Sequence, residues 1–490
     1  LYYYVHGDKL VYASEIKAIV GVIRELGDMG EVRPKDKVIA SYLLKRSHDN
    51  TEETFFEGVK RVPAGSYLEW DLKKNSYTVN KFWEIGSLFK KESPLQGDSL
   101  IAEFRQLFED SVRIRLISEV PVGTALSGGL DSSAVVCEIA KEMAKRAKME
   151  KKDKEGDVEQ KILGKRQRTF SAVFPGKINN EEEYIDEVIA KTNVENHKIA
   201  PKREEMWKDL EKVIYHQDEP MISTGPYAQW KVMELAKKNG VKVLLDGQGA
   251  DEMLAGYDPY FIVYIKELIR GLKVLGVIRE IWASKDRLFS LLKNKSNLKV
   301  QELFNINDSY IGSHPGILQG ETLEHEETLE RVGNKNNNLN NRLLKDIFEN
   351  SLPALLRYED RNSMAFSIEA RVPFLDYRLV EFVASLPSNY KIRNGWSKWI
   401  MREALKDLLP KKIVERRWKV GFTTPEVSWF RESTLEVREI LNSASFNSRK
   451  YFNHAKIREA FEDFVNGKND ESMVFWRIIN LELWLRVFID

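Results

Sequence analysis

The sequence contains a single cysteine, Cys137, among its 490 residues. One thiol cannot form a disulfide within the chain, which is typical of proteins from a reducing compartment, so we expect a cytoplasmic protein. Cys137 follows three small apolar residues in the predicted helical run 134–137, and we expect it to be a small buried side chain.

An excess of charge of one sign is also lacking. Lys and Arg together number 76 and Asp and Glu number 75, which leaves a formal net charge of +1. Binding to nucleic acid depends on a basic field that this balance does not supply. We therefore expect no nucleic-acid partner.

Long apolar runs are lacking as well. The first residues, Leu1 to His6, have no basic region followed by an apolar stretch and do not resemble a signal peptide. The most apolar segment, residues 260–283, is interrupted by four cations, which are Lys266, Arg270, Lys273 and Arg279. These charges exclude a simple membrane span, and we expect no membrane partner.

The length of the chain predicts two domains. Residues 1–85 have the pattern of short strands and turns, with strands at 2–5 and 9–12 around Gly7-Asp8 and a second pair at 66–70 and 76–79. A helix is predicted at 36–44. The polar stretch 90–98 predicts the boundary, which divides the chain into residues 1–90 and 91–490.

After residue 100 predicted helices and short apolar strands alternate. Strands are expected at 122–126, 169–174 and 241–245, and helices at 101–117, 181–192 and 227–238. This alternation predicts an α/β fold, with a parallel sheet covered by helices on both faces. The chain becomes largely helical after about residue 260. Two polar segments, 145–168 and 333–342, are predicted surface loops without an assigned function.

The most informative motif is the run Val120 to Ser133, with the sequence VPVGTALSGGLDSS. An apolar strand leads into Ser-Gly-Gly, and a helix begins at Ser132-Ser133. The glycines allow a tight turn, and the unpaired N–H groups of the new helix favour an anionic guest. The motif lacks the Gly-Lys-Ser/Thr ending of a Walker loop. Helix capping by Ser and Asp is the structural alternative.

SGGLDSS resembles the PP-loop of the N-type ATP pyrophosphatases. The longer run EVPVGTALSGGLDSSAVV is similar to asparagine synthetases and related amidotransferases. Three further runs match that family in the expected order: LLDGQGADE at 244–252, MAFSIEARVPFLD at 364–376 and SKWIMREA at 397–404. The resemblance covers roughly residues 110–430.

This resemblance implies ATP and Mg²⁺ as cofactors, and aspartate and ammonia or glutamine as further substrates. Phosphate binding is implied for residues of the SGGLDSS loop, which are Leu126, Ser127, Gly128, Gly129, Asp131, Ser132 and Ser133. Adenosine binding is implied for Ala172, Val173, Asp246 and Gly247. Asp131 and Asp251 would bind the metal, although capping and a solvated loop acid are the alternatives. Lys398 would be the catalytic cation, although a lysine on its predicted helix 397–408 is ordinarily solvated.

Substrate binding is implied for Gln248, Glu252, Arg371 and Asp376. A structural salt bridge is an equally good interpretation of Arg371 and Asp376. Gln248 departs from relatives that carry glutamate there, and an amide cannot act as a general base. The second strand carries Ser-Ala-Val-Phe where many relatives have Ser-Ile-Gly-Phe, which leaves the adenine contacts open.

Residues 1–20, together with Arg61 to Gly65, resemble the closing strands of a class II glutamine amidotransferase, an Ntn-type glutaminase domain. Such domains begin with a catalytic cysteine, whereas residue 1 is a leucine, so we expect a truncated glutaminase domain. The resemblance implies an asparagine synthetase that amidates aspartate through a β-aspartyl-AMP intermediate. Two alternatives stay open: an adenylating enzyme that acts on another carboxylate, as in β-lactam formation or cell-envelope amidation, and an inactive partner-binding subunit. A homodimer also stays open.

Overall fold

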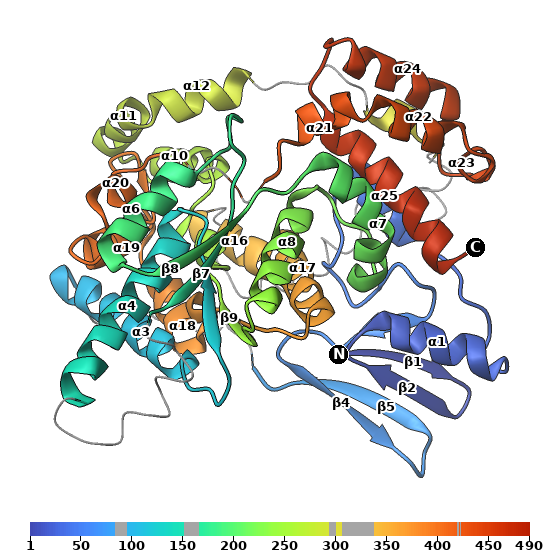
Figure 1. The fold of residues 1–490 in the computed structure, drawn as a ribbon, viewed down its shortest axis with the longest axis horizontal. Helices are drawn as coiled ribbons and strands as arrows, with labels where there is room; N and C mark the ends of the chain where they lie inside the picture. The colour runs from blue at the N-terminus through green and yellow to red at the C-terminus, as the bar shows by residue number, and fades with distance from the viewer. Residues whose placement is uncertain (84–95, 151–165, 294–299, 306–337, 419–420, 422) are drawn as a thin grey trace.

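The computed structural model describes residues 1–83, 96–150, 166–293, 300–305, 338–418, 421 and 423–490 (Figure 1). Most of the predicted domain boundary at 90–98 therefore lies outside the described residues. So do the larger part of the predicted loop 145–168 and the first half of the loop 333–342. The helix that follows the Ser-Gly-Gly turn continues to Glu150, beyond the start predicted for the first of these loops.

A five-stranded parallel sheet forms the centre of the chain, in the order β10-β9-β6-β7-β8 (Figure 1). Its strands are β6 (Val122–Ala125), β7 (Arg168–Ala172), β8 (Glu195–Ile199), β9 (Val243–Leu245) and β10 (Glu369–Arg371). Every neighbouring pair in this sheet is parallel. The predicted fold class and the three predicted strands are confirmed.

Helices cover both faces of this sheet, as predicted. Side chains alternate between the two faces along a strand: Leu244 belongs to one buried cluster, and its neighbours Val243 and Leu245 belong to another. The Leu244 face is covered by α7 (Arg203–Gln217), α8 (Gly225–Lys238) and α17 (Leu352–Ala365). The opposite face is covered by α3 (Asp98–Arg115), α4 (Leu130–Glu150), α6 (Glu182–Thr192), α18 (Tyr377–Ser385) and α19 (Trp399–Leu405).

Two strands of the sheet, β8 and β10, were not predicted from the sequence. β10 has only three residues, and it pairs with β9 more than 120 positions earlier in the chain, Ala370 lying opposite Leu244. β8 carries Glu195 and Lys198 at the edge of the sheet. Neither strand has the apolar run that identifies a buried strand in a sequence.

The other helices and strands after residue 249 lie between β9 and β10 or after β10. They are α9 (Ala250–Leu254), α10 (Pro259–Arg270), α11 (Val274–Ala283), α12 (Lys285–Lys293), α16 (Leu339–Lys345), β11 (Ile392–Arg393), β12 (Trp396–Ser397), α20 (Lys411–Val414), α21 (Glu426–Glu432), α22 (Thr434–Asn442), α23 (Ala444–Ser448), α24 (His454–Val465) and α25 (Ser472–Phe488). No helix in the described part of the chain combines the length and apolar character that crossing a membrane requires.

The N-terminal residues form a small antiparallel sheet and a separate hairpin. The sheet has the order β2-β1-β3, from β1 (Tyr2–His6), β2 (Lys9–Ala13) and β3 (Val59–Arg61), and the hairpin consists of β4 (Ser66–Asp71) and β5 (Ser76–Lys81). Both predicted hairpins and the predicted helix, α2 (Asp36–Lys45), are confirmed. The prediction of strands and turns missed one helix, α1 (Ile16–Leu26).

These N-terminal residues share a buried core with the last helix of the chain. Phe55 and Phe56 pack their ring edges against Trp484 of α25, with ring centroids 5.5 and 5.0 Å apart. Phe56 also contacts Phe488. The two ends of the chain therefore stabilise each other by burial of apolar surface.

Asp218, at the end of α7, binds the start of α1 from about 200 positions away. Its two carboxylate oxygens accept hydrogen bonds from the backbone N–H groups of Ile16 and Lys17, at 3.0 and 3.1 Å. The residue that precedes α1, Glu15, makes no side-chain cap of its own. Because the cap comes from a distant residue, the local sequence around α1 lacks the usual start signal for a helix.

Asp218→Ala should lower the free energy of unfolding by about 3 kcal/mol, because it removes this cap and the buried carboxylate that pairs with the guanidinium of Arg361. The change can be measured by urea unfolding monitored through tryptophan fluorescence. Asp360→Ala is the matched control, since Asp360 also pairs with Arg361 but its side chain is 54% exposed. We expect Asp360→Ala to lower the free energy of unfolding by less than about 1 kcal/mol. Equal losses of stability in the two variants would contradict the capping role of Asp218.

Candidate active site

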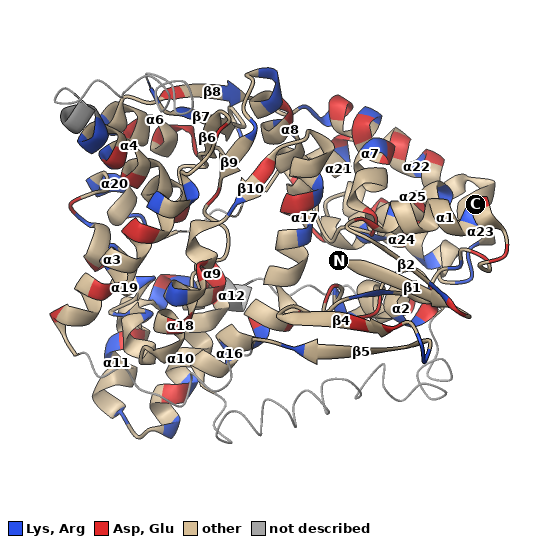
Figure 2. Cartoon of the chain, turned by 90° about the horizontal axis from the view of Figure 1, so that it is seen from below, with Lys and Arg blue, Asp and Glu red and all other residues tan. Residues whose placement is uncertain are grey.

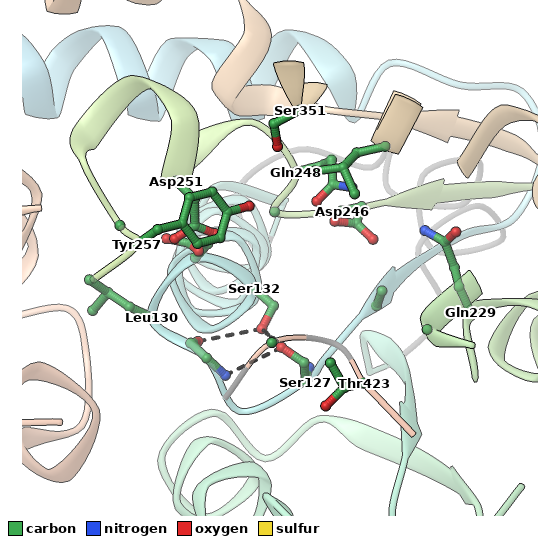
Figure 3. A pocket seen from close by; sticks show the side chains of 18 of the residues that line it. Ser127, Leu130, Ser132, Gln229, Asp246, Gln248, Asp251, Tyr257, Ser351 and Thr423 are labelled. Atoms are coloured by element: carbon green, nitrogen blue, oxygen red, sulfur yellow. Dashed lines mark hydrogen bonds between the residues drawn. The ribbon is translucent and has the colours of Figure 1, made fainter. Parts of the chain in front are cut away.

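A cavity of about 380 Å³ opens at the carboxyl ends of the central strands (Figure 3). This is the edge of an open α/β sheet at which ligands ordinarily bind. The loops after β6 and β9, the turn before α19 and helix α17 contribute to its wall. Figure 3 shows Ser127 and Ser132 in its lower part, Asp246 and Gln248 at the upper right, and Asp251 and Tyr257 at the upper left.

The Ser-Gly-Gly turn after β6 is held together by the hydroxyls of its own serines. Ser132 Oγ accepts a hydrogen bond from the Ser127 backbone N–H at 3.2 Å, and the two hydroxyls lie 3.0 Å apart (Figure 3). Gly128 has φ +77°, a conformation that L side chains rarely adopt. Helix α4 begins at Leu130, and Leu130, Asp131 and Ser132 line the cavity, so the positive end of the helix dipole favours an anion there.

The loop after β9 approaches this turn so closely that a side chain would not fit between them. A Cβ atom on Gly247 would lie 2.8 Å from the Ser132 nitrogen and 2.9 Å from Asp131 Cβ. Gly247, Asp246 and Gln248 line the cavity. Burial raises the pKa of Asp246 to about 6, and backbone N–H groups of Gln248 and Gly247 oppose that rise.

Lys398 lies between two carboxylates from the two strand-end loops. Its Nζ is 2.6 and 2.5 Å from the two oxygens of Asp131 and 2.7 Å from Asp251 Oδ1. Burial by itself would lower the pKa of Lys398, but the nearby Asp131 and Asp251 outweigh it and raise that pKa. The lysine is therefore a buried cation at the mouth of the Ser-Gly-Gly turn.

The alternative of a solvated lysine on a helix face is contradicted by the structure. Lys398 is only 4% exposed and precedes α19, with a left-handed φ of +53°. The predicted helix 397–408 therefore begins at Trp399. The turn before Lys398 is fixed by Glu280 of α11, whose carboxylate accepts hydrogen bonds from the Asn394 and Gly395 N–H groups at 2.7 and 2.9 Å.

Asp131 and Asp251 fit a magnesium ion in one respect. Their oxygens converge on a single point, which the Lys398 ammonium takes in this structure, and Mg²⁺ in nucleotide sites is commonly held by one or two carboxylates together with phosphate oxygens. The described residues contain no group of three or more His, Cys, Asp or Glu side chains arranged to hold a metal. Any Mg²⁺ held here would therefore need phosphate oxygens as further ligands.

Several predicted site residues lie outside the cavity wall. Arg371 donates to the backbone oxygens of Arg115 and Ile117, both at 2.7 Å, just beyond α3. Asp376 caps α18 and binds Arg115 and Arg378, which together lower its pKa to about 2 although its burial acts in the opposite direction. These contacts support the structural interpretation of both residues, since they occupy the groups that a substrate would need.

The second strand contributes Phe170, rather than Ala172 or Val173, to the residues that line the cavity. Ala172 and Val173 are buried in the two apolar clusters on opposite faces of the sheet. Ser133 is fully buried behind the turn. Glu252 is also fully buried, and its Oε1 accepts hydrogen bonds from the hydroxyls of Tyr257 and Ser351, which do line the cavity.

Three arginines in the cavity wall were not predicted: Arg402, Arg416 and Arg417. Arg416 donates to the Gly128 carbonyl at 3.1 Å, and its guanidinium lies 4.1 Å from the centre of the Tyr184 ring. Burial, together with the nearby cation of Arg287, lowers the pKa of Arg402 to about 10. The adjacent arginines Arg416 and Arg417 were the only hint of these residues in the sequence, and folding is needed to bring Arg416 to the Ser-Gly-Gly turn.

The far end of the cavity reaches the N-terminal part of the chain. His48 and Tyr358 line it, and their Nε2 and hydroxyl groups are hydrogen-bonded. Burial lowers the pKa of His48 to about 4, so this imidazole is neutral at physiological pH. The cavity is therefore lined by charged groups of both signs at the Ser-Gly-Gly end and by the neutral imidazole at the His48 end.

Comparison with known proteins identifies the family. Residues 103–486 match the family model described as asparagine synthase. This chain belongs to the asparagine synthase family. The match covers the sheet, the Ser-Gly-Gly turn and Lys398, and it makes the chain a member of a family of ATP-dependent ligases.

Individual relatives agree with this assignment. The chain is 26% identical to asparagine synthetase [glutamine-hydrolyzing] 1 of Bacillus subtilis, over all of this chain and 74% of that protein. It is 28% identical to asparagine synthetase [glutamine-hydrolyzing] 3 of the same organism, over 85% of this chain and 62% of that protein. It is also similar to the amidase chry2 of Gibberella zeae, at 23% identity over 98% of this chain and 74% of that protein.

Gly256→Ala should reduce turnover at least a hundredfold, because a Cβ atom there would lie 1.8 Å from Asp251 Oδ1 and 2.5 Å from Lys398 Cε. A displacement of about 1 Å at a reacting centre has effects of that size. Turnover can be measured as pyrophosphate release from ATP. Gly21→Ala in α1 is the control, since nothing lies within 4 Å of its Cβ position, and an active Gly256→Ala enzyme would contradict the close packing described here.

Proposed function

We propose that this chain converts aspartate to asparagine by an ATP-dependent amidation, in which a β-aspartyl-AMP intermediate forms and AMP and pyrophosphate are released. The observation that supports it best is the buried Lys398 ammonium at the Ser-Gly-Gly turn, 2.5–2.7 Å from Asp131 and Asp251. One cation is thereby fixed beside a turn that binds anions. Membership of the asparagine synthase family supports the same reaction.

The chemistry explains why such a site is needed. A carboxylic acid does not form an amide with ammonia directly, because ammonia merely takes up the proton of the acid and leaves an unreactive carboxylate. Attack of the aspartate β-carboxylate on the α-phosphorus of ATP breaks the bond between the α- and β-phosphates, expels pyrophosphate and forms a mixed anhydride. Ammonia then attacks the acyl carbon, its extra proton is lost, and AMP leaves. The site must neutralise phosphate charge, align the reactants and exclude water.

The residues of this chain are suited to the first of these tasks. The Ser127–Ser132 turn and the start of α4 would bind the pyrophosphate part of ATP, with Arg416 supporting the turn through the Gly128 carbonyl. Asp131 and Asp251 would hold Mg²⁺, which supplies charge neutralisation at the phosphates when it is bound. Asp246 and Gly247 would contact the nucleoside.

Lys398 would also serve the first task, the neutralisation of phosphate charge. A fixed ammonium next to the α-phosphate stabilises the charge that develops there as the β-phosphate leaves, without any reorganisation at the moment of reaction. Its neighbours keep it protonated. Gln248, whose side chain lies at the cavity, would orient a substrate group by hydrogen bonding.

We further propose that residues 1–90 correspond to the closing part of a class II glutamine amidotransferase domain, and that residues 91–490 form the synthetase domain. The three-stranded antiparallel sheet of residues 2–61 supports the first assignment. Cys137 would not serve as a glutaminase nucleophile, because burial raises the pKa of its thiol to about 12.

A second candidate function is adenylation of a different carboxylate. Arg371 and Asp376, which would hold the charged groups of aspartate according to the family resemblance, are bonded within the protein instead. The relative named as an amidase shows that the family includes proteins with other names. The identity of the carboxylate that is adenylated therefore distinguishes the two candidate functions.

Incubation of the purified chain with ATP, Mg²⁺, aspartate and ammonium should yield AMP, pyrophosphate and asparagine in equal amounts. Chromatography of the nucleotides and amino acids measures all three. ADP and phosphate as products would contradict the adenylate mechanism. Turnover with another acid, but not with aspartate, would favour the second candidate.

Lys398→Ala is the diagnostic variant for this experiment. It should lower turnover about a hundredfold, which is about 2.7 kcal/mol, by analogy with loss of one donor from an oxyanion site. Lys406→Ala is its control. Lys406 directly follows α19, the helix that Lys398 precedes, but it is exposed and pairs with Glu403. Normal turnover of Lys398→Ala would remove Lys398 from the mechanism.

With ammonium chloride as the nitrogen source, asparagine formation by the 490-residue polypeptide should rise from neutral to mildly alkaline pH, because ammonium must lose its proton to become a nucleophile. Glutamine should not support the reaction through Cys137, because burial of this thiol raises its pKa to about 12. Cys137→Ala should leave the rate with ammonium unchanged. Release of glutamate from glutamine that disappears in Cys137→Ala would show that Cys137 is a nucleophile after all.

A further inference from the structure

Helix α11 exposes most of its apolar side chains and buries its acidic one, Glu280. Leu275 is 86% exposed, Trp282 75%, Val274 63%, Ile278 61% and Ile281 43%. At 100° per residue these five positions fall within an arc of about 120°, so they form one continuous apolar face. A helix of a globular protein ordinarily turns such a face inward.

The opposite face of α11 is held in place by a buried acid. Glu280 is fully buried, and its carboxylate accepts the hydrogen bonds from Asn394 and Gly395 described above. Rotation of the helix to bury its apolar face would break these bonds and leave the N–H groups of Asn394 and Gly395 without their acceptor. The outward orientation of the apolar face is therefore fixed by the fold.

The surroundings of this face combine further apolar side chains with positive charge. Leu272, 85% exposed, and Ile269, 54% exposed, extend the apolar surface toward α10. Within residues 262–289, all of which the structure describes, the exposed cations are Lys266, Arg270, Lys273, Arg279 and Lys285, and the exposed acid is Asp286. The Lys285 ammonium lies 5.9 Å from the centre of the Trp282 ring.

The position of α11 in the molecule leaves this face accessible. In both views α11 lies at an outer edge, away from β1 and β2 (Figures 1 and 2). Apolar surface of this extent on a protein ordinarily marks a binding site. The combination of an apolar stripe that carries tryptophan with flanking lysine and arginine is typical of helices that lie in the interface of a membrane.

We propose that α11 docks this protein onto an anionic membrane surface, with its apolar face at the level of the acyl chains and its flanking cations at the phosphate groups. A second copy of the chain fits less well, because a two-fold contact through this face would bring both sets of cations together. The interrupted apolar run at 260–283, which excludes a span, has the composition that such a helix needs. This proposal does not depend on the proposed reaction.

Flotation of the full chain with vesicles tests the proposal. The protein should bind vesicles that contain about one third phosphatidylglycerol in phosphatidylcholine, bind vesicles of phosphatidylcholine alone much more weakly, and be released as salt is added. Lys273→Glu with Arg279→Glu should weaken binding at least about thirtyfold. Leu275→Gln with Ile278→Gln and Trp282→Gln should weaken it at least about a hundredfold.

Matched controls come from other exposed surfaces. Leu72→Gln with Leu435→Gln removes two apolar side chains that are 88% and 80% exposed, and Lys74→Glu with Lys411→Glu reverses two exposed cations. Both control variants should bind as the parent does, and circular dichroism confirms that all variants are folded. Absence of binding, or equal binding by the α11 variants, overturns the proposal. Concentration-dependent self-association that the α11 variants abolish, without vesicle binding, would identify a second copy as the occupant.

Discussion

The contact of one ammonium with two carboxylates organises the rest of this structure. Lys398 meets Asp131 and Asp251 at 2.5–2.7 Å, and these three residues come from three separate parts of the chain. A buried lysine without such partners would lose its charge. The loops must approach one another closely for this contact to form. Positions 247 and 256 therefore have no room for a Cβ atom, and both are glycine.

A second buried ionic network joins the N-terminal residues to the helix that borders the cavity. Arg357 of α17 binds Asp49 through its Nε and donates to three backbone carbonyls between Gln217 and Pro220. Its neighbour Tyr358 is hydrogen-bonded to His48 in the cavity wall. Breaking one partner of a buried pair is costly, so this network ties the position of the N-terminal segment to the shape of the cavity.

Helix α11 links the surface of the molecule to the same lysine. Its buried carboxylate, Glu280, holds the Asn394-Gly395 turn, and Lys398 follows that turn by three residues. The helix therefore has two faces with different demands. The inner face carries Glu280, which accepts hydrogen bonds from the backbone N–H groups of Asn394 and Gly395. Because Glu280 must point inward to do so, the apolar face points outward.

The sequence by itself determined the elements whose signals are local. The apolar strands at 122–125, 168–172 and 243–245 and the glycine turn at 127–129 depend on neighbouring residues alone, and all were predicted. Tertiary structure decided the rest. Strand β10 exists because β9 offers it hydrogen-bonding partners, α1 begins where Asp218 caps it, and Arg416 reaches the turn only after folding. Whether a cation such as Lys398 is solvated or buried between carboxylates depends on which distant residues pack around it, and no local pattern carries that information.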